Sequence, residues 1–299
     1  MEDRGGKLFQ SFFSGEAREF LLRGIDLALE EDGPDLTSRG IFAQEDSLSA
    51  LLVAKEATLV AGLPLVDLVL KSLGAEENVR VRHLVPEGSR VRAGDGVCRL
   101  EGSAGMILRA ERVIINYVAH LSGVADLTAN FTERMRGSDT RLLDTRKTLP
   151  GLRYPEKYAV RIGGGHNHRM NLSQMLMLKD NHLDRAGGIG RAVSLLKRAY
   201  SACPPIVVEC RTQEEVDEAI AAKVDRILLD NMGPESLSAA LERIPGGIET
   251  EISGGVGLES IAELAALGAD YISVGNLTNA ARSRDFSMRI DLNGPAPKA

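Results

Sequence analysis

Four short apolar runs, IVVEC (206–210), RILLD (226–230), ETEISGG (249–255) and YISVG (271–275), decide the fold of this chain. Between them lie helical stretches such as TQEEVDEAIAA and PESLSAALERI, which carry the Thr or Pro and the early acidic residues that start helices. Successive strand ends are separated by 21 to 23 residues, the length of one strand, one loop and one helix. This repetition predicts a parallel sheet covered by helices.

Two further runs, RLLDT (141–145) and MLMLK (175–179), extend the pattern toward the N-terminus. An open doubly wound sheet and a barrel both fit it. We favour the barrel, because the C-terminal strand ends of a barrel converge on one mouth, whereas in an open sheet they lie along an edge. Because only about six units are visible, we expect an incomplete α/β barrel of six to seven parallel strands. Each run ends at a residue that can take part in binding or catalysis: Asp144 or Thr145, Lys179, Glu209, Asp230, Ser253 and Gly275.

Residues 1–120 have a different character and are expected to form a separate α/β domain. Apolar spacing predicts a helix over residues 14–29 with Ser14 as its N-cap. A small sheet is expected near residues 48–61, and antiparallel strands over residues 81–100. The longest helical pattern covers residues 104–132 and could be interrupted at Ser122-Gly123.

Composition limits the function. The whole chain carries a net charge of −6, yet residues 141–182 hold eight Lys or Arg and three of the five histidines against three acidic residues. A local field of that sign attracts a small polyanion rather than a nucleic acid, which usually needs a long basic face. No export signal or membrane-spanning run is visible. Three cysteines without CxxC spacing favour a reducing cytoplasm.

Two carboxylates follow buried strands at equivalent positions, Glu209 and Asp230. Both would lie at the barrel mouth, where they could share a Mg²⁺ ion or the two hydroxyls of a ribose. The alternative is that each caps a helix or pairs with an arginine. Lys179 also ends an apolar run, where a lysine is costly unless it meets an anion or extends to solvent.

Glycines mark two kinds of loop. The loops Ser253-Gly254-Gly255 and Gly275-Asn276 follow neighbouring strands, so their backbone N–H groups could hold a phosphate, although simple turns are an equally good interpretation. Gly163–Gly165 would let a loop turn tightly and present His168 and Arg169 inward. No P-loop, Rossmann fingerprint or serine-hydrolase motif is present, and a zinc site at His166-Asn167-His168 lacks a second ligand pair.

Longer motifs give the chain a close resemblance to the quinolinate phosphoribosyltransferase family of type II phosphoribosyltransferases. The resemblance extends over residues 17–290, about nine-tenths of the chain. The motifs are Glu111-Arg112 with Asn116, LSGVA (121–125), DTRKT (144–148), EKYAV (156–160), GGGHNHRMNL (163–172), KDNH (179–182), LDNM (229–232) and SGGV (253–256).

The resemblance implies an enzyme that joins quinolinate to phosphoribosyl pyrophosphate, releasing carbon dioxide and pyrophosphate and giving nicotinate mononucleotide for NAD synthesis. It implies that Arg146, His168, Arg169 and Lys179 hold quinolinate, that Arg112 comes from a partner subunit and that Lys147 lies beside both substrates. Glu209 and Asp230 then look like the ribose and magnesium carboxylates. Ser253, Gly254, Gly255 and Gly275 look like the 5-phosphate cradle, with Asn276 next to it.

The family architecture is an N-terminal α/β sandwich, here residues 1–120 joined by residues 284–299, and an incomplete α/β barrel, here residues 121–283. Its members form dimers whose active sites lie between subunits. The sequence leaves open whether this chain forms an oligomer larger than a dimer. Two rival functions remain: a phosphoribosyltransferase for another acidic heterocycle, as in the homologue associated with molybdenum transport, and a non-catalytic ligand sensor on the same scaffold.

Overall fold

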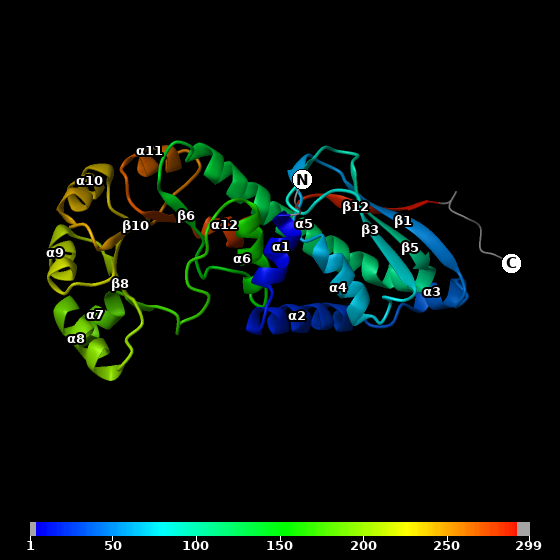
Figure 1. Ribbon diagram of the computed structural model, residues 1–299, viewed down its shortest axis with the longest axis horizontal. Coiled ribbons are helices and arrows are strands. Elements are labelled where there is room, and N and C mark those ends of the chain that lie inside the picture. The colour runs from blue at the N-terminus through cyan, green and yellow to red at the C-terminus, as the bar shows by residue number, and fades with distance from the viewer. Residues whose placement is uncertain (1–3, 292–299) are drawn as a thin grey trace. The chain divides into compact units, whose positions relative to one another are not determined.

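The computed structural model describes residues 4–291, and the chain forms two compact units (Figure 1). The first unit comprises residues 1–129, 148–164 and 278–299, and the second comprises residues 130–147 and 165–277. Residues 292–299, the end of the segment predicted to join the N-terminal domain, lie outside the described part of the chain. The predicted domain ranges themselves remain predictions.

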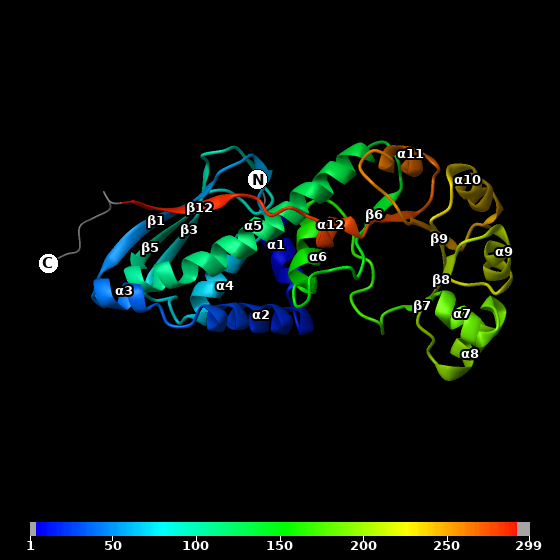
Figure 2. The same ribbon diagram turned by 180° about the vertical axis from the view of Figure 1, so that it is seen from behind.

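A four-stranded antiparallel sheet forms the centre of the first unit, with the strand order β12-β1-β5-β3. Figures 1 and 2 show the C-terminal strand β12 lying beside β1, as the register from Ala54–Phe286 onward requires. A separate two-stranded sheet pairs β2 with β4. The antiparallel pairing expected over residues 81–100 is confirmed by β3 and β5. The strands are β1 (Ser47–Ala54), β2 (Thr58–Leu59), β3 (Val79–His83), β4 (Arg90–Val91), β5 (Gly96–Ser103) and β12 (Phe286–Asp291).

The helices of the first unit begin slightly differently from the prediction. Gly15, not Ser14, is the N-cap of α2, and the residues before it form a separate helix, α1. Gly15 has a φ of 51°, a conformation that glycine adopts more readily than serine. The helices are α1 (Arg4–Phe12), α2 (Glu16–Asp32), α3 (Leu36–Ile41), α4 (Pro64–Ser72), α5 (Ala104–Arg134) and α6 (Arg153–Ile162).

Helix α5 runs without interruption through Ser122-Gly123, where a break had been possible. Gly123 serves close packing instead, because a Cβ atom there would lie 2.2 Å from the carbonyl oxygen of Arg282. Ser122 is fully buried, and its hydroxyl accepts a hydrogen bond from the backbone N–H of Ala61 at 3.0 Å. The small residues therefore allow the chain before β12 to pack directly on the helix.

An aromatic cluster joins α1 to α6. The ring centroids of Phe9, Phe12 and Phe13 lie 5.2 to 5.7 Å from that of Tyr158. The hydroxyl of Tyr158 donates to Glu87 at 2.8 Å, and the same carboxylate accepts from the backbone N–H groups of residues 62 and 63 at the start of α4. One carboxylate thus ties the aromatic cluster to a helix N-terminus, where negative charge is favourable.

Six parallel strands in the order β6-β11-β10-β9-β8-β7 form the sheet of the second unit. On the free side of β6, Leu143 forms an isolated parallel bridge with His166, which adds the beginning of a seventh strand. Strand β11, the last strand of this unit in the sequence, pairs with β6, the first, as in a barrel. The predicted incomplete α/β barrel is therefore confirmed. The strands are β6 (Arg141–Leu143), β7 (Leu176–Leu178), β8 (Ile206–Cys210), β9 (Arg226–Asp230), β10 (Glu249–Ser253) and β11 (Tyr271–Ser273).

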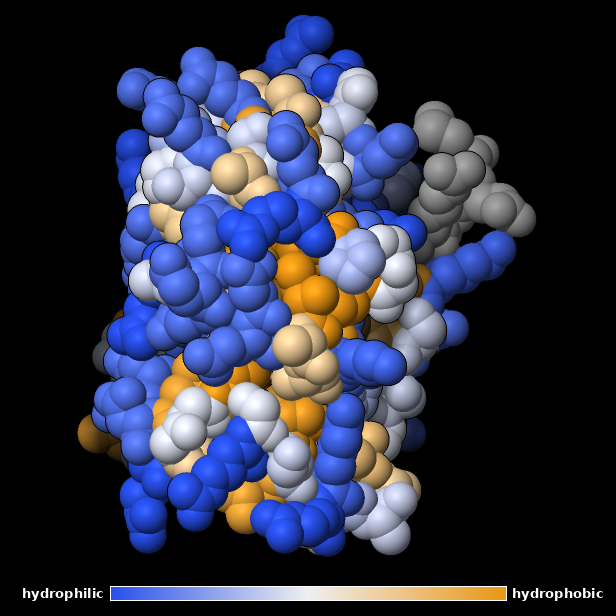
Figure 3. Space-filling model, turned by 90° about the vertical axis from the view of Figure 1, so that its left-hand side faces the viewer, coloured by the Kyte–Doolittle hydropathy of each residue, from blue (hydrophilic) through white to orange (hydrophobic). Residues whose placement is uncertain are grey.

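Helices cover the outer side of these strands, and the two helices predicted after Cys210 and Gly233 are present (Figure 1). Thr212 caps α9 by accepting from the backbone N–H of Glu215, and Pro234 begins α10. Figure 3 shows mostly hydrophilic residues on the side where these helices lie, with hydrophobic patches among the hydrophilic residues. The helices are α7 (Asp180–Ala186), α8 (Ile189–Ala199), α9 (Gln213–Ala221), α10 (Pro234–Arg243), α11 (Ile261–Ala266) and α12 (Asn276–Asn279).

Two features bear on the environment of the protein. Over residues 4–291, none of the helices has the length and apolar character needed to cross a membrane. Cys98, Cys203 and Cys210 are free thiols, and two of them are buried.

Candidate active site

A cavity of about 490 Å³ opens in the second unit at the C-terminal ends of the parallel strands, the end at which α/β barrels carry their active sites. The register aligns two of these ends, because Asp230 on β9 lies opposite Ser253 on β10. The cavity brings together ten of the residues selected from the sequence: Arg146, Lys147, His168, Arg169, Lys179, Glu209, Asp230, Ser253, Gly254 and Gly255.

Two guanidinium groups, those of Arg146 and Arg169, contribute positive charge to the cavity beside Lys147 and Lys179. Burial and the neighbouring charge of Arg146 lower the pKa of Arg169. The Nε atom of Arg146 is buried and has no hydrogen-bond partner among residues 4–291. Arg169 is held at one end, since its Nη1 atom donates to the carbonyl oxygen of Met175 at 2.8 Å. Two like charges held side by side, one with an unsatisfied donor, favour the binding of an anion.

A buried carboxylate shapes the loop that carries His168 and Arg169. Asp144 follows β6 and is fully buried. Its Oδ1 atom accepts from the backbone N–H of His168 at 2.8 Å, and its Oδ2 atom accepts from Nδ2 of Asn167 at 2.6 Å. Buried polar groups of this kind are costly unless paired, so the pairing fixes the loop after the three glycines against the barrel.

The acidic side of the cavity consists of Glu209 and Asp230. Glu209 accepts from Nζ of Lys179 at 2.6 Å, and Asp230 accepts from Nδ2 of Asn231 at 2.7 Å. Within the described residues, no three His, Cys, Asp or Glu side chains form a ready-made metal site. Two carboxylates nevertheless suit Mg²⁺, because this ion is usually bound by one or two protein carboxylates with water and substrate phosphates. The donor set therefore fits a magnesium ion that arrives with a phosphorylated substrate.

Glycine occupies three positions near the strand ends, and the local structure differs at each of them. Gly254 has a φ of 92°, and a Cβ atom there would lie 2.7 Å from the backbone nitrogen of Asn231. Gly255 also has a positive φ, but a Cβ atom would meet nothing within 4 Å. Gly275 lies against Lys147, whose Cδ atom would be 2.8 Å from an added Cβ. Gly254 thus allows close strand-end packing, Gly255 faces open space, and Gly275 makes room for the lysine stem.

Three of the selected residues, Arg112, Gly275 and Asn276, are not lining residues of this cavity. Arg112 is an exposed residue of α5 in the first unit. Asn276 is the first residue of α12, directly after the glycine that contacts Lys147. The roles assigned to these residues remain predictions.

Besides Thr145, which was noted at the end of its strand, three polar cavity residues were not assigned a role from the sequence: Asn231, Glu251 and Ser273. Glu251 is the most unusual, because this carboxylate is fully buried in the middle of β10. A signal for it was present in the sequence. Alternate residues of a strand face the same side, so Glu251 shares the side of Ser253.

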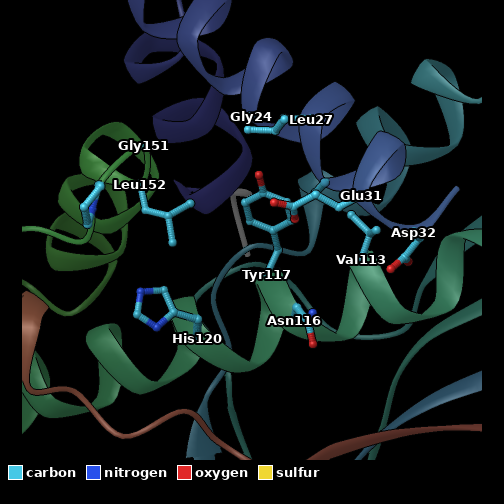
Figure 4. Close-up of a pocket in the computed structure, with 12 residues that line it drawn as sticks. Gly24, Leu27, Glu31, Asp32, Val113, Asn116, Tyr117, His120, Gly151 and Leu152 are labelled. Atoms are coloured by element: carbon cyan, nitrogen blue, oxygen red, sulfur yellow. The ribbon is translucent and has the colours of Figure 1, made fainter.

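A second cavity, of about 300 Å³, lies wholly in the first unit (Figure 4). Tyr117 and His120 reach into it from α5, and Glu31 and Asp32 come from α2. Burial and the charge of Glu31 raise the pKa of Tyr117 to about 12. Its lining contains two carboxylates and neither lysine nor arginine, so the cationic cavity of the barrel is the better site for an anion.

The barrel, with cations and carboxylates at the ends of its strands, defines an α/β-barrel enzyme that handles small anionic substrates. Residues 35–122 match the family model of the quinolinate phosphoribosyl transferase N-terminal domain, and residues 124–289 match that of the C-terminal domain. The chain belongs to the quinolinate phosphoribosyltransferase family.

Individual relatives agree with the family models. The probable nicotinate-nucleotide pyrophosphorylase (carboxylating) of Bacillus subtilis is 39% identical over 266 residues, which cover 89% of this chain and 91% of that protein. The NadC structure from Streptococcus pyogenes has 38% identity and a TM-score of 0.85, covering 89% of this chain and 95% of that one. The nicotinate-nucleotide pyrophosphorylase structure from Francisella tularensis has 33% identity and a TM-score of 0.86, covering 94% and 99%. The family, the fold and the enzyme class expected from the sequence are confirmed.

Proposed function

We propose that this chain transfers the phosphoribosyl group of phosphoribosyl pyrophosphate to quinolinate with decarboxylation, giving nicotinate mononucleotide, carbon dioxide and pyrophosphate. The observation that carries the proposal is the pair Arg146 and Arg169, which line one cavity, where burial and the charge of Arg146 lower the pKa of Arg169. A dicarboxylate neutralises such a pair. The names of the relatives support this function and not the alternatives, a different heterocycle or a sensor.

In this proposal, Arg146, Arg169 and Lys179 bind the two carboxylates of quinolinate, and His168 lies among them. Guanidinium groups match carboxylates geometrically and make strong charge-assisted hydrogen bonds. Two carboxylates held at fixed positions orient the ring nitrogen toward the anomeric carbon of the ribose. Orientation of this kind supplies much of the rate enhancement in a reaction between two bound substrates.

Glu209 and Asp230 take the phosphoribosyl side of the reaction in the proposal. Their oxygens would accept hydrogen bonds from the ribose hydroxyls and hold Mg²⁺, which neutralises the charge of the departing pyrophosphate. Lys147 lies at the same cavity and supplies a further positive charge. Ser253, Gly254 and Gly255 are proposed to hold the 5-phosphate with backbone N–H groups, because the position of Gly255 is open.

The chemistry proceeds in two stages without a protein nucleophile. The ring nitrogen forms a bond to the anomeric carbon as the bond from that carbon to pyrophosphate breaks. The bond to the adjacent carboxylate then breaks and releases carbon dioxide. The positively charged ring nitrogen stabilises the electron pair left behind, which takes up a proton. Fixed cations around the ring exclude other orientations and stabilise the leaving charge.

We also propose that the protein works in the cytoplasm as a homodimer with shared active sites, and that Arg112 completes the site of the partner subunit. The exposed position of Arg112 on α5 and the family membership support the dimer. Free, partly buried thiols support a reducing compartment.

The direct test incubates the purified protein with quinolinate, phosphoribosyl pyrophosphate and Mg²⁺ and measures nicotinate mononucleotide. We expect product with quinolinate and little or none when nicotinate replaces it, because nicotinate lacks the second carboxylate. Equal rates with both acids would exclude the proposed recognition. Binding of quinolinate without turnover, measured by calorimetry in the same preparation, would favour the sensor.

A further inference from the structure

A buried carboxylate behind the cavity, Glu251, connects two cationic or ionisable side chains. Its Oε2 atom lies 3.3 Å from Nε2 of His168 and 2.9 Å from Nη1 of Arg226. Glu251 is fully buried, and the side chain of His168 is only 5% exposed. Burial works against the charged form of Glu251, yet the interactions with His168, Ser273 and Arg226 hold its pKa below the ordinary value. The carboxylate is therefore charged and able to accept hydrogen bonds.

Arg226 explains how this charge is tolerated. Its guanidinium donates to Glu251 and also to Glu249, to which Nε and Nη2 donate at 2.9 and 2.7 Å. The Arg226 side chain also stacks over the ring of Tyr271 at 4.0 Å. A buried carboxylate with such a partner is well compensated, whereas an unpaired one would be strongly destabilising.

Both ring nitrogens of His168 face groups of the protein, Nδ1 through a hydrogen bond and Nε2 through its 3.3 Å approach to the Glu251 carboxylate. Its Nδ1 atom accepts from the backbone N–H of Arg169 at 2.7 Å. A ring nitrogen that accepts a hydrogen bond carries no proton, so the ring proton of neutral His168 is on Nε2, which faces Glu251. The imidazole thus connects a fixed carboxylate in the barrel wall to the backbone of Arg169.

We propose that Glu251, supported by Arg226, is a positioning residue: it holds His168 as the Nε2–H tautomer, and His168 in turn fixes the backbone of Arg169 so that its guanidinium faces the cavity. Arg169 is then held at both ends, because its Nη1 atom donates to the carbonyl oxygen of Met175. Preorganised side chains of this kind strengthen binding because less ordering is needed when the ligand arrives. This inference deepens the proposed function and rests on it for the identity of the anion, but not for the state of His168.

The first test observes the wild-type network and needs no substrate. The full-length protein is labelled with ¹⁵N-histidine, and the ring nitrogens are observed by NMR near neutral pH. His168→Gln serves only to assign one signal among those of the five histidines. We expect His168 to be neutral with its proton on Nε2. A proton on Nδ1, or a doubly protonated ring, would overturn the proposal.

The second test compares three variants of the same strand. Glu251→Leu removes the acceptor, Glu251→Gln keeps an acceptor oxygen without the charge, and Glu249→Gln removes a carboxylate that also pairs with Arg226 but does not line the cavity. In Glu251→Leu we expect mixed tautomers of His168 and a KM for quinolinate raised roughly tenfold, the scale of a lost polar interaction with a charged group. The KM for phosphoribosyl pyrophosphate should stay close to wild type.

Glu251→Gln should restore most of the loss, and Glu249→Gln should behave like wild type. Equal increases in both KM values, an absence of recovery in Glu251→Gln, or an equal defect in Glu249→Gln would each contradict a positioning role. If Glu251→Leu does not fold, the NMR measurement on the wild-type protein still decides the matter. If no nicotinate mononucleotide forms although His168 is Nε2-protonated, the proposed function fails and the positioning network stands.

Discussion

Gly275→Ala gives a sharp test of how the barrel places Lys147. A Cβ atom at residue 275 would lie 2.8 Å from Cδ and 3.6 Å from Nζ of Lys147. Ordinary van der Waals contact begins near 3.4 Å, so the lysine stem must move by at least the difference, 0.6 Å. The backbone of Gly275 does not require a positive φ, so the alanine itself is not strained.

The magnitude follows from what has to move. The contact is with the flexible stem of an exposed lysine and not with backbone, so we expect the free energy of unfolding to change by less than about 1 kcal/mol. A displacement of about 1 Å in a catalytic group can reduce the rate by roughly 100-fold. Gly275→Ala should therefore lower kcat by about 10- to 100-fold while the thermal midpoint stays nearly unchanged.

The assay measures initial rates of nicotinate mononucleotide formation beside thermal unfolding of the same samples. Gly257→Ala is the matched control, because a Cβ atom at residue 257 would meet nothing within 4 Å and the residue has no positive φ. The reasoning is refuted if Gly275→Ala retains full activity, or if its activity falls only in proportion to a loss of folded protein.

Three further predictions concern the cavity, the subunits and pH. Arg146→Gln should raise the KM for quinolinate by about 10- to 100-fold through loss of charge-assisted hydrogen bonds, whereas Arg185→Gln on α7 should not. Steady-state kinetics with each substrate varied in turn will show whether the two variants differ in this KM. Arg112→Ala and Lys147→Ala should each be inactive, yet regain activity when their subunits are exchanged, since a hybrid dimer contains one intact site; no recovery under proven exchange would exclude a shared site. Burial raises the pKa of Glu87 to about 7 despite hydrogen bonds that lower it. The folded protein then binds this proton more tightly than the unfolded chain. The free energy of unfolding should therefore be greatest below the ordinary Glu pKa near 4.5 and should fall as pH rises to about 7. The loss should be at most about 3 kcal/mol, because the side chain is partly exposed. Urea unfolding at several pH values should show this loss, and Glu87→Gln should reduce it.

Patterns that repeat along the chain predicted the barrel and its mouth well. Glu209 and Asp230 lie in the last two residues of the buried strands β8 and β9, and the position of a strand end is a local property that sequence spacing can reveal. The same holds for Lys179, which immediately follows β7. The barrel closure was predictable for a related reason, because parallel strands with short connections leave few topologies.

Contacts between distant residues could not be predicted in this way. The ion pair of Lys179 with Glu209 joins residues 30 positions apart, and the spacing of neither residue indicates the other. Gly123 was considered as a helix break because glycine weakens helices, but the close approach of the Arg282 backbone depends on packing. Glu251 was missed because its compensation by Arg226 and His168 is visible only when strands and loops are assembled.

The ion pair of Lys179 and Glu209 also links the two halves of the proposed site. In the proposed function, Lys179 belongs to the side that binds quinolinate, and Glu209 to the side that binds the ribose and magnesium. The lysine side chain is 48% exposed and that of Glu209 is 16% exposed, so solvent screens the pair mainly at its lysine end. A bound dicarboxylate can therefore compete with Glu209 for Lys179, and a Glu209 released from its lysine has a carboxylate oxygen available for a metal ion or a hydroxyl. Because Glu209 and a carboxylate of the ligand compete for the same ammonium group of Lys179, binding on one side of the cavity changes the charge available to a ligand on the other side.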